Sequence, residues 1–442
     1  MTRLRLPNAR LLLFALLAAL VFAFAACGGD DDVDVDLTNI ERGPDTPIVI
    51  PAGVPIVVGV SSALTGPIEE RGREYLNAVT TSVERWKAAN GDLIGGHEIT
   101  VVGEDDGCSE PGVAIVAARR LLQREGLVGV IGPQCSGGAS PAAPAYAAAG
   151  IVAISGSATA TALTKGQKDD GFFFRTAYRN DLEGALIALF VTDALQAETV
   201  YLIDDGELFG EDLADTAQRL LTRPGIDVTR ASVQQGDVDF SDLASQIAAD
   251  NPDFVVFAGF NPEAALLLRQ IRDAGYDGLF GAGDGAASQG DFVEPLGEVA
   301  EGALFAGCGY PLPEDFKADF VALHGDVPQA SFPAQFADAT TALLDAVAMV
   351  AQPQDDGSLL IDPKELRDAV RASDFAGVSG PIAFDSKGDR VPAPGDELEE
   401  VLDKGFELQD TQVLIDLGLV QCQVQDGQIV IVSGSGAPDV RF

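Results

Sequence analysis

Short apolar runs alternate with longer amphipathic stretches along most of the chain. The first run covers residues 56–60, and the stretch after it places Tyr75 and Trp86 on one helical face. Further apolar runs of the same kind occupy residues 98–102, 127–131 and 151–154. Short buried strands separated by helices of ten or more residues are typical of a parallel sheet covered on both faces. The pattern therefore predicts a doubly wound α/β unit.

The alternation begins again at residue 172 and predicts a second α/β unit of similar build. Its expected strands are 172–176, 199–203, 226–233, 254–258 and 279–282, and its expected helices are 180–195, 209–222, 240–249 and 262–274. After a strand at 303–307, the helices expected near 313–323, 334–352 and 363–371 do not alternate with strands. We expect them to cover the first unit. We expect no regular structure in an insertion at 392–410, and strands at 413–417, 419–424 and 428–432.

The N-terminal residues predict export. A basic start is followed by an apolar run of sixteen residues, 11–26, which is short for a membrane span and suits a signal peptide over residues 1–26. Small residues before Cys27 resemble the bacterial lipobox, in which the cysteine is lipidated and becomes the mature N-terminus. Phe24 departs from the leucine usual at that place. The alternative is cleavage near Ala26 with a soluble product.

Residues 27–54 are interpreted as an acidic tether. Residues 30–36 form a solvated charge run, and the prolines at 44, 47, 51 and 55 argue against regular structure. An acidic run can also bind calcium, but this one lacks the glycine turn and the distal glutamate of a calcium loop.

Composition narrows the class of protein. The chain has 442 residues, 47% of them hydrophobic, which is enough for two domains. Its 68 acidic and 28 basic residues give a formal charge of −40, and such a surface repels nucleic acid. The acidic surface favours solubility without naming a ligand.

The motifs of common enzymes are absent from the sequence. The two histidines are His97, in an expected turn with Gly95 and Gly96, and His324, at an expected helix end, and neither has a metal-ligand partner at the next helical turn. There is no Gly-x-Ser-x-Gly elbow and no phosphate-binding loop. The glycines at 281–285 do not have the spacing of a dinucleotide loop. We therefore expect no enzyme activity, metal or cofactor.

Hydroxyl-bearing turns follow two of the expected strands. Ser136 follows one strand end, and Ser157, Ala158 and Thr159 follow the next. Ligands in parallel α/β sheets bind beyond the carboxyl ends of the strands, and hydroxyls and helix-start N–H groups suit a carboxylate. We interpret residues 105–164 as one wall of a small-molecule site.

The opposite wall is expected in the second unit. Asp284 follows its last regular strand, where an ammonium group would find a negative charge, and Phe209 and Phe260 stand at equivalent turns. Each candidate also has an ordinary explanation as a helix cap, a turn former or a core residue. Their shared position at strand ends favours binding.

Several short motifs stand in a characteristic order. They are Val-Gly-Val at 58–60, Leu-Thr-Gly-Pro at 64–67, Asp-Asp-Gly-Cys at 105–108, Ile-Gly-Pro-Gln-Cys-Ser at 131–136, Ser-Ala-Thr at 157–159, Leu-Thr at 163–164, Phe-Arg-Thr at 174–176, Phe-Gly-Glu at 209–211, Gly-Pro-Ile-Ala-Phe-Asp at 380–385 and Lys-Gly-Asp at 387–389. With them the chain resembles the type I periplasmic binding proteins of the branched-chain amino acid family, the substrate receptors of ABC importers, over about residues 54–432.

The resemblance implies two α/β lobes joined by three hinge strands. Residues 55–175 with 306–395 would form lobe 1, and 176–305 with 412–442 would form lobe 2. The site residues that it implies are Ser136, Ser157 and Thr159 for the carboxylate and amino group, with Ala158 in the same turn, Asp284 for the ammonium, and Phe209 and Phe260 at aromatic positions where tyrosine is usual. Arg71 falls where an aromatic residue often lines the side-chain pocket. It could pair with an acidic or polar ligand side chain, or it could turn to solvent.

The cysteines that remain after Cys27 are even in number, which suggests disulfides beyond the cytoplasmic membrane. The resemblance implies a bond between Cys108 and Cys135. Cys308 and Cys422 lie outside the matched motifs, in or beside expected lobe-crossing strands, and we expect them to pair.

The resulting expectation is a monomeric, lipid-anchored, extracytoplasmic receptor. It would deliver an amino acid, branched-chain or another small one, or a related amide to an ABC permease in the membrane. The alternative is a sensor of the same fold that signals to a membrane partner and transports nothing.

Overall fold

The structure is a computed structural model, and it describes residues 42–168, 170–222, 225–309, 311–396 and 419–432. All of them belong to one compact unit, Ile40–Phe442. The expected signal peptide, Cys27, most of the acidic tether and the strand expected at 413–417 lie outside the described residues, as does the expected insertion beyond residue 396. Within the described part of the chain, no helix has both the length and the apolar character needed to cross a membrane.

A six-stranded sheet forms the first lobe, in the order β3-β4-β2-β5-β6-β7. Its strands are β2 (Ile56–Ser62), β3 (Leu93–Ile94), β4 (His97–Asp105), β5 (Leu127–Ile131), β6 (Val152–Ser155) and β7 (Phe173–Arg175). All neighbouring strands are parallel except β3 and β4. The central strands are buried on both faces, and they are therefore continuous apolar runs.

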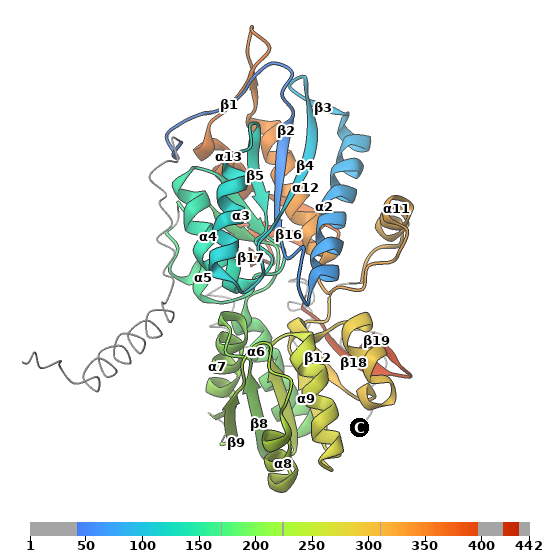
Figure 1. The fold of residues 1–442 in the computed structure, drawn as a ribbon. Helices are drawn as coiled ribbons and strands as arrows, with labels where there is room; N and C mark the ends of the chain where they lie inside the picture. The colour runs from blue at the N-terminus through green and yellow to red at the C-terminus, as the bar shows by residue number, and fades with distance from the viewer. Residues whose placement is uncertain (1–41, 169, 223–224, 310, 397–418, 433–442) are drawn as a thin grey trace, which may run out of the picture. The chain divides into compact units, whose positions relative to one another are not determined.

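Helices cover both faces of this first sheet (Figure 1). They are α2 (Glu69–Asn90), α3 (Pro111–Leu122), α4 (Ser136–Ala148), the short α5 (Ala162–Lys165), α11 (Glu314–His324), α12 (Pro333–Val350) and α13 (Pro363–Arg371). The last three come from far along the chain; α12 packs on α2, β5 and β6, α11 on α2, and α13 on α12 and β6. They cover the first unit, as the sequence predicted.

A seven-stranded sheet forms the second lobe, in the order β19-β18-β12-β11-β10-β8-β9. Its strands are β8 (Thr199–Asp204), β9 (Asp227–Ser232), β10 (Phe254–Ala258), β11 (Leu279–Ala282), β12 (Leu304–Ala306), β18 (Gln421–Gln425) and β19 (Gln428–Ile431), and its main helices are α6 (Asn180–Leu189), α7 (Leu208–Thr222), α8 (Ser241–Asp250) and α9 (Asn261–Asp273). The first five strands are parallel, and β18 and β19 add an antiparallel edge. The helix expected over 180–195 is α6 followed by a π-helical segment, Phe190–Leu195.

The chain passes between the lobes after β7, after β12, and between β17 (Arg390–Val391) and β18. The fold is therefore two α/β lobes with three connections, although residues 397–418 of the third connection are not described. The residue bounds of the lobes stay a prediction. Beside the first connection, Asp389 forms buried ion pairs with Arg175, at 2.7 Å, and with Arg179, at 3.0 Å.

Part of the expected tether is folded. Residues Ile48–Ile50 form β1, which pairs antiparallel with β14 (Leu359–Ile361), and β14 also pairs with β13 (Gln352–Pro353). Ile48 and Ile50 are buried. The prolines at 47 and 51 only flank this edge strand, where proline is tolerated. The expectation of no regular structure is thus wrong for residues 48–50.

His97 is a strand residue and not a turn residue. Gly95 and Gly96, both at positive φ, make the two-residue hairpin turn without it, and His97 is the first residue of β4. Its imidazole is buried between two carbonyl oxygens, with Nδ1 2.7 Å from Val54 O and Nε2 3.1 Å from Gly357 O. It serves the packing of the first lobe.

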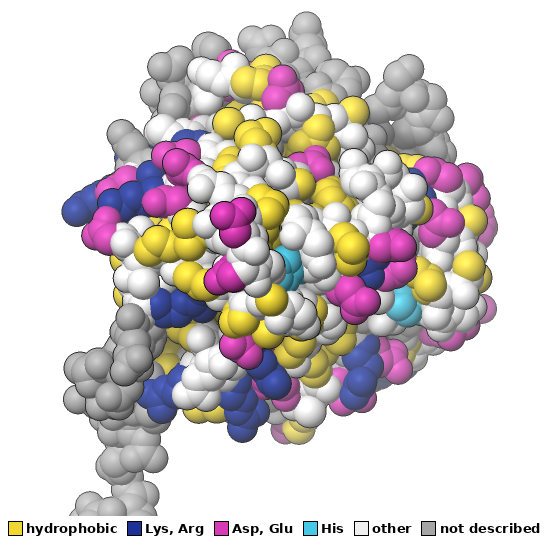
Figure 2. Space-filling model, turned by 90° about the horizontal axis from the view of Figure 1, so that it is seen from above, with side chains coloured by type: hydrophobic (Ala, Val, Ile, Leu, Met, Phe, Trp, Pro, Cys, Tyr) yellow, Lys and Arg dark blue, Asp and Glu magenta, His cyan; other side chains and the backbone are white. Residues whose placement is uncertain are grey.

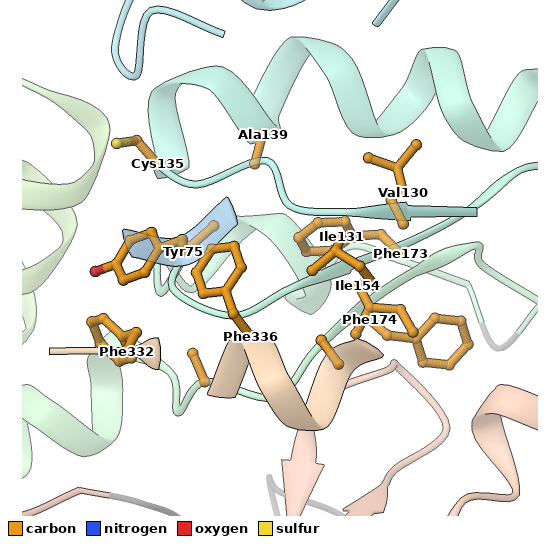
Figure 3. Packing of buried hydrophobic residues seen from close by; sticks show 14 of the residues in the cluster. Tyr75, Val130, Ile131, Cys135, Ala139, Ile154, Phe173, Phe174, Phe332 and Phe336 are labelled. Carbon is orange, nitrogen blue, oxygen red and sulfur yellow. The ribbon is translucent and has the colours of Figure 1, made fainter. Parts of the chain in front are cut away.

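Aromatic residues fill the core of the first lobe at the end of the sheet that faces the second lobe. The ring of Tyr75, from α2, stacks on that of Phe336, from α12, with centroids 4.2 Å apart, and Phe332 lies beside them (Figure 3). This packing fixes the start of α2 against α12. Acidic side chains are spread among basic and apolar ones on the face shown in Figure 2, rather than gathered in one patch.

Candidate functional site

A cavity lies between the two lobes, beyond the carboxyl ends of strands from both sheets. The cavity is narrow, and its free space reaches about 300 Å³ only when the open solvent at its mouth is counted. It is lined by Arg71, Tyr75, Gln134, Cys135, Ser136, Ser157 and Phe332 from the first lobe and by Phe209, Phe260, Asp284 and Gly285 from the second. Six of the eight residues predicted to bind ligand line this cavity.

The first-lobe end of the cavity offers hydrogen-bond donors. Ser136 is the first residue of α4, and its Oγ accepts from the N–H of Ala160 at 3.1 Å, which leaves its hydroxyl hydrogen without an acceptor among the described residues. The helix has no side-chain cap, so its first N–H groups are available to an anion. Ser157 donates to the carbonyl of Gln134 at 2.6 Å and keeps its lone pairs for a donor. This end suits a carboxylate.

Ala158 and Thr159 are not among the lining residues. Two hydrogen bonds hold the backbone of their turn. The N–H of Ala158 donates to Oγ of Ser155 at 2.9 Å, and the guanidinium of Arg175 donates to the carbonyl of Ala158. Both residues are fully buried, and the hydroxyl of Thr159 has no partner among the described residues. The sequence motif placed them in the turn beside Ser157, and their roles as ligand-binding residues stay a prediction.

The second-lobe end is acidic. Asp284 is buried in the turn after β11, and its Oδ2 accepts from the hydroxyl of Tyr178 at 2.9 Å. Its backbone N–H donates to Oε1 of Glu183 at 2.8 Å. Burial raises the pKa of Asp284 to about 7. Burial, and then the charge of Asp284, raise the pKa of Glu183 well above its usual range.

Sequence reasoning missed Glu183 and Tyr178. Glu183 is fully buried in the first turn of α6, and Tyr178 lies on the first connection between the lobes. The apolar spacing of α6 puts Glu183 on a face that is otherwise buried, and that was the available signal. No pattern marked Tyr178, because its role depends on contact with a strand end a hundred residues further on.

Aromatic side chains form the remaining walls. Phe209 and Phe260 pack together with ring centroids 5.4 Å apart. Gly285 allows this packing, since a Cβ there would meet Phe209 at 2.8 Å and the carbonyl of Gly259 at 2.5 Å. Tyr75, read from the sequence as a core residue, also lines the cavity, as does Phe332. The middle of the cavity is therefore apolar.

Arg71 is buried at the start of α2, and only 5% of its surface is exposed. Its Nη2 donates to Oδ1 of Asn261, in the second lobe, at 2.6 Å. The sequence left open whether Arg71 faces the cavity or turns to solvent. In the structure it does not turn to solvent.

Both expected disulfides are present. Cys108–Cys135 has a Cα–Cα distance of 4.9 Å and joins the turn after β4 to the residue before α4, beside Ser136. Cys308–Cys422 has a Cα–Cα distance of 6.0 Å and joins the end of β12 to β18, where two connections enter the second lobe. In the chain-entropy model, closing loops of these lengths contributes roughly 3–5 kcal/mol each.

A larger groove adjoins the cavity on the other side of Phe260. It encloses about 790 Å³, including open solvent, between residues 63–68 and 107–110 of the first lobe and 235–236 and 260–263 of the second. Phe260 is the residue common to both linings. No group of three or more metal-ligating side chains is found within the described ranges.

Comparisons with known proteins point to one family. A family profile described as "Periplasmic binding protein" matches residues 55–395. The leucine-, isoleucine-, valine-, threonine- and alanine-binding protein of Pseudomonas aeruginosa is 28% identical over 345 residues, 76% of this chain and 87% of that protein. An amino acid binding protein of the same organism is 32% identical over 234 residues, and the match covers 53% of this chain but only 61% of that relative.

Solved structures agree on the fold. A leucine binding protein from Thermotoga maritima superposes with a TM-score of 0.70 at 25% identity, covering 86% of this chain and 98% of the other. The branched-chain amino acid transporter substrate binding protein of Streptococcus pneumoniae, solved with isoleucine, has a TM-score of 0.69 at 22% identity, covers 85% and 97%, and supports the fold alone. The chain therefore belongs to the type I periplasmic binding proteins of the branched-chain amino acid family, which bind solutes and are not enzymes.

Proposed function

We propose that this protein binds an α-amino acid between its lobes and delivers it to an ABC permease. The observation that carries the proposal is that hydrogen-bond donors from the first lobe and an acidic group from the second lobe line the same cavity. Ser136, at the uncapped start of α4, would hold the α-carboxylate, and Asp284, on the other lobe, would hold the ammonium. The relatives named above support the ligand class, because their names state amino acids.

Binding at this cavity would couple the ligand to lobe closure. The two ends of the ligand head would contact different lobes, so the ligand would favour the arrangement in which both ends are in reach. Arg71 and Asn261 already form a hydrogen bond between the lobes, and the N–H of Thr161 donates to Asp212 at 2.8 Å. We propose that the permease recognises this closed form.

Cys27 is proposed to carry the lipid anchor after removal of residues 1–26. The proposal rests on the lipobox-like residues before it, and the family supports a location beyond the cytoplasmic membrane. Because residues 48–50 belong to the first lobe, the proposed tether shortens to about residues 28–47. Mass spectrometry of the native protein would detect the acyl chains, and an unmodified N-terminus at Gly28 or nearby would contradict the anchor.

Isothermal titration calorimetry against a panel of α-amino acids tests the ligand class. We expect Asp284→Ala and Ser136→Ala to weaken binding about tenfold to a hundredfold, since each removes a hydrogen-bond partner of a charged group and 1.4 kcal/mol corresponds to tenfold. Asp277→Ala, an exposed aspartate in the turn before β11, is the matched control and should bind normally. No binding of any α-amino acid, or unchanged binding in both site variants, would contradict the proposal.

A further inference from the structure

Arg71 carries a charge that no acidic side chain of the described residues pairs. Its single hydrogen bond among the described residues goes to the neutral amide of Asn261, and its Nε is buried without a partner. It forms no ion pair within the described part of the chain. A buried guanidinium without a counter-charge is unfavourable, so its position in a ligand cavity needs an explanation.

The acidic groups near Arg71 are occupied by other partners. Both carboxylate oxygens of Glu74, one helical turn along, accept the backbone N–H groups of Gln329 and Ala330. Asp291 accepts from Asn261 and Ser288, and Asp284 accepts from Tyr178. These carboxylates interact with the charge of Arg71 only at longer range. None of them contacts it.

Asn261 sets the direction of the guanidinium. The amide donates through Nδ2 to Asp291 at 2.9 Å, which leaves Oδ1 to accept from Arg71. Asn261 is the first residue of α9 in the second lobe and Arg71 lies in the first turn of α2 in the first lobe, so their hydrogen bond holds the guanidinium between the two lobes. Asn261 is thus a positioning residue, and the remaining N–H groups of Arg71 have no partner among the described residues and are available to a ligand.

We propose that the ligand is an acidic amino acid, whose side-chain carboxylate pairs with Arg71. This inference rests on the proposed function: if the α-carboxylate occupies the start of α4 and the ammonium occupies Asp284, Arg71 is left facing the side chain. A planar guanidinium matches a carboxylate with two parallel hydrogen bonds. The surrounding rings of Tyr75, Phe209 and Phe260 make the cavity less polar than water, which strengthens such a pair.

The same geometry explains rejection of other side chains. An aliphatic side chain in this cavity would leave Arg71 desolvated and unpaired, and sites with buried polar groups discriminate strongly against ligands that cannot satisfy them. A neutral amide of the same shape would satisfy the hydrogen bonds but not the charge. The expected order of affinity is therefore glutamate or aspartate first, then glutamine or asparagine, then leucine and valine.

Calorimetry on the mature chain with glutamate, aspartate, glutamine and leucine tests the assignment. We expect the preferred acidic amino acid to bind at least about 30-fold more tightly than glutamine and leucine. Arg71→Met keeps the length of the side chain without its charge, and should abolish that preference while leucine binds as well or better. Arg71→Gln is the second variant if Arg71→Met does not fold. Arg73→Met, an exposed arginine on the same helix, is the control and should leave the order unchanged.

Each contrary result has a distinct meaning. Tighter binding of leucine than of glutamate by the unaltered protein would overturn the acidic ligand. An equal loss of glutamate and leucine binding in Arg71→Met would also overturn it, because Arg71 would then hold the group common to all amino acids. Glutarate, which lacks the amino group, separates this proposal from the preceding one. Binding of glutarate through Arg71 without binding of any amino acid would support an anion site there and contradict the proposed function.

Discussion

Glu183 accepts a hydrogen bond from the backbone N–H of Asp284 at 2.8 Å, so two buried carboxyl groups lie together at one end of the cavity. Tyr178 donates to Asp284 at the same place. Arg71 also acts on Asp284, and its positive charge favours the ionised form. An ammonium group would bring the second positive charge to this acidic end.

Ligand affinity is expected to rise with pH. Burial raises the pKa of Asp284 to about 7, so much of this carboxyl group is protonated below neutrality and cannot pair with an ammonium. Calorimetry between pH 5.5 and pH 8 should show affinity falling up to about tenfold per pH unit below 7. An affinity that does not change over this range would contradict the role of Asp284. Asp284→Asn, which cannot ionise, is the control and should show a flatter profile.

Stability without ligand is expected to change in the opposite sense. Burial raises the pKa of Asp284 and Asp205 to about 7 and of Asp106 and Asp338 to about 6, against about 3.9 in an unfolded chain. Between these values the folded state binds more protons than the unfolded state, so the free energy of unfolding falls as pH rises from about 4 to 7. Glu183, whose pKa burial raises well above its usual range, adds to this fall. His324 has the opposite effect. Burial lowers its pKa, so its contribution to the free energy of unfolding rises with pH.

Thermal unfolding at constant ionic strength measures that trend. We expect a higher Tm at pH 5 than at pH 8 in the absence of ligand. A Tm that increases from pH 5 to pH 8 would show that these carboxyl groups ionise freely in the folded protein. The Asp205→Asn variant should reduce the difference, since it removes one of the groups that drive it.

Asp389→Asn is expected to destabilise the protein by about 3 kcal/mol, because it removes the carboxylate paired with the buried Arg175 and one of the carboxylates paired with Arg179, which keeps Asp181. Asp389 contacts both Arg175 and Arg179 at the first connection between the lobes. Urea unfolding followed by circular dichroism measures the change. Asp368→Asn removes an aspartate paired with Arg367 at the surface and should shift stability by less than about 1 kcal/mol. Similar effects of the two substitutions would contradict the structural role of the buried pairs.

Phe260→Ala is expected to weaken amino acid binding about tenfold or more. The substitution removes an apolar wall and joins the cavity to the solvent-filled groove beside it, and burial of apolar surface is worth about 25 cal/mol per Å². Calorimetry with the best ligand of the unaltered protein is the measurement. Leu323→Ala, an exposed leucine on α11, is the control. Unchanged affinity in Phe260→Ala would place the ligand away from the shared wall.

Local pattern was sufficient for the architecture and for part of the site. A parallel strand buried on both faces needs a continuous apolar run and a covering helix, and both are visible within about thirty residues of sequence. Because parallel strands end at one edge, the residues after them, such as Ser136 and Asp284, could be grouped before their distance was known. Strands that pair far along the chain or in short hairpins were missed. Among them are Ile48–Ile50 and its partner Leu359–Ile361, about three hundred residues later, and the small sheet of Asp374–Gly377, Gly380–Phe384 and Arg390–Val391.

Contacts between segments far apart in the chain could not be predicted from local sequence patterns. Glu183 and Tyr178 meet Asp284 because the first connection packs against a strand end of the second lobe. Ala158 is held in the turn after β6 by Arg175 and Ser155, and it does not line the cavity. Whether Arg71 faced the site or the solvent depended on Asn261, across the gap between the lobes. Periodicity reports which face of an element is buried, whereas the partner of a buried polar group depends on the packing of elements far apart in the chain.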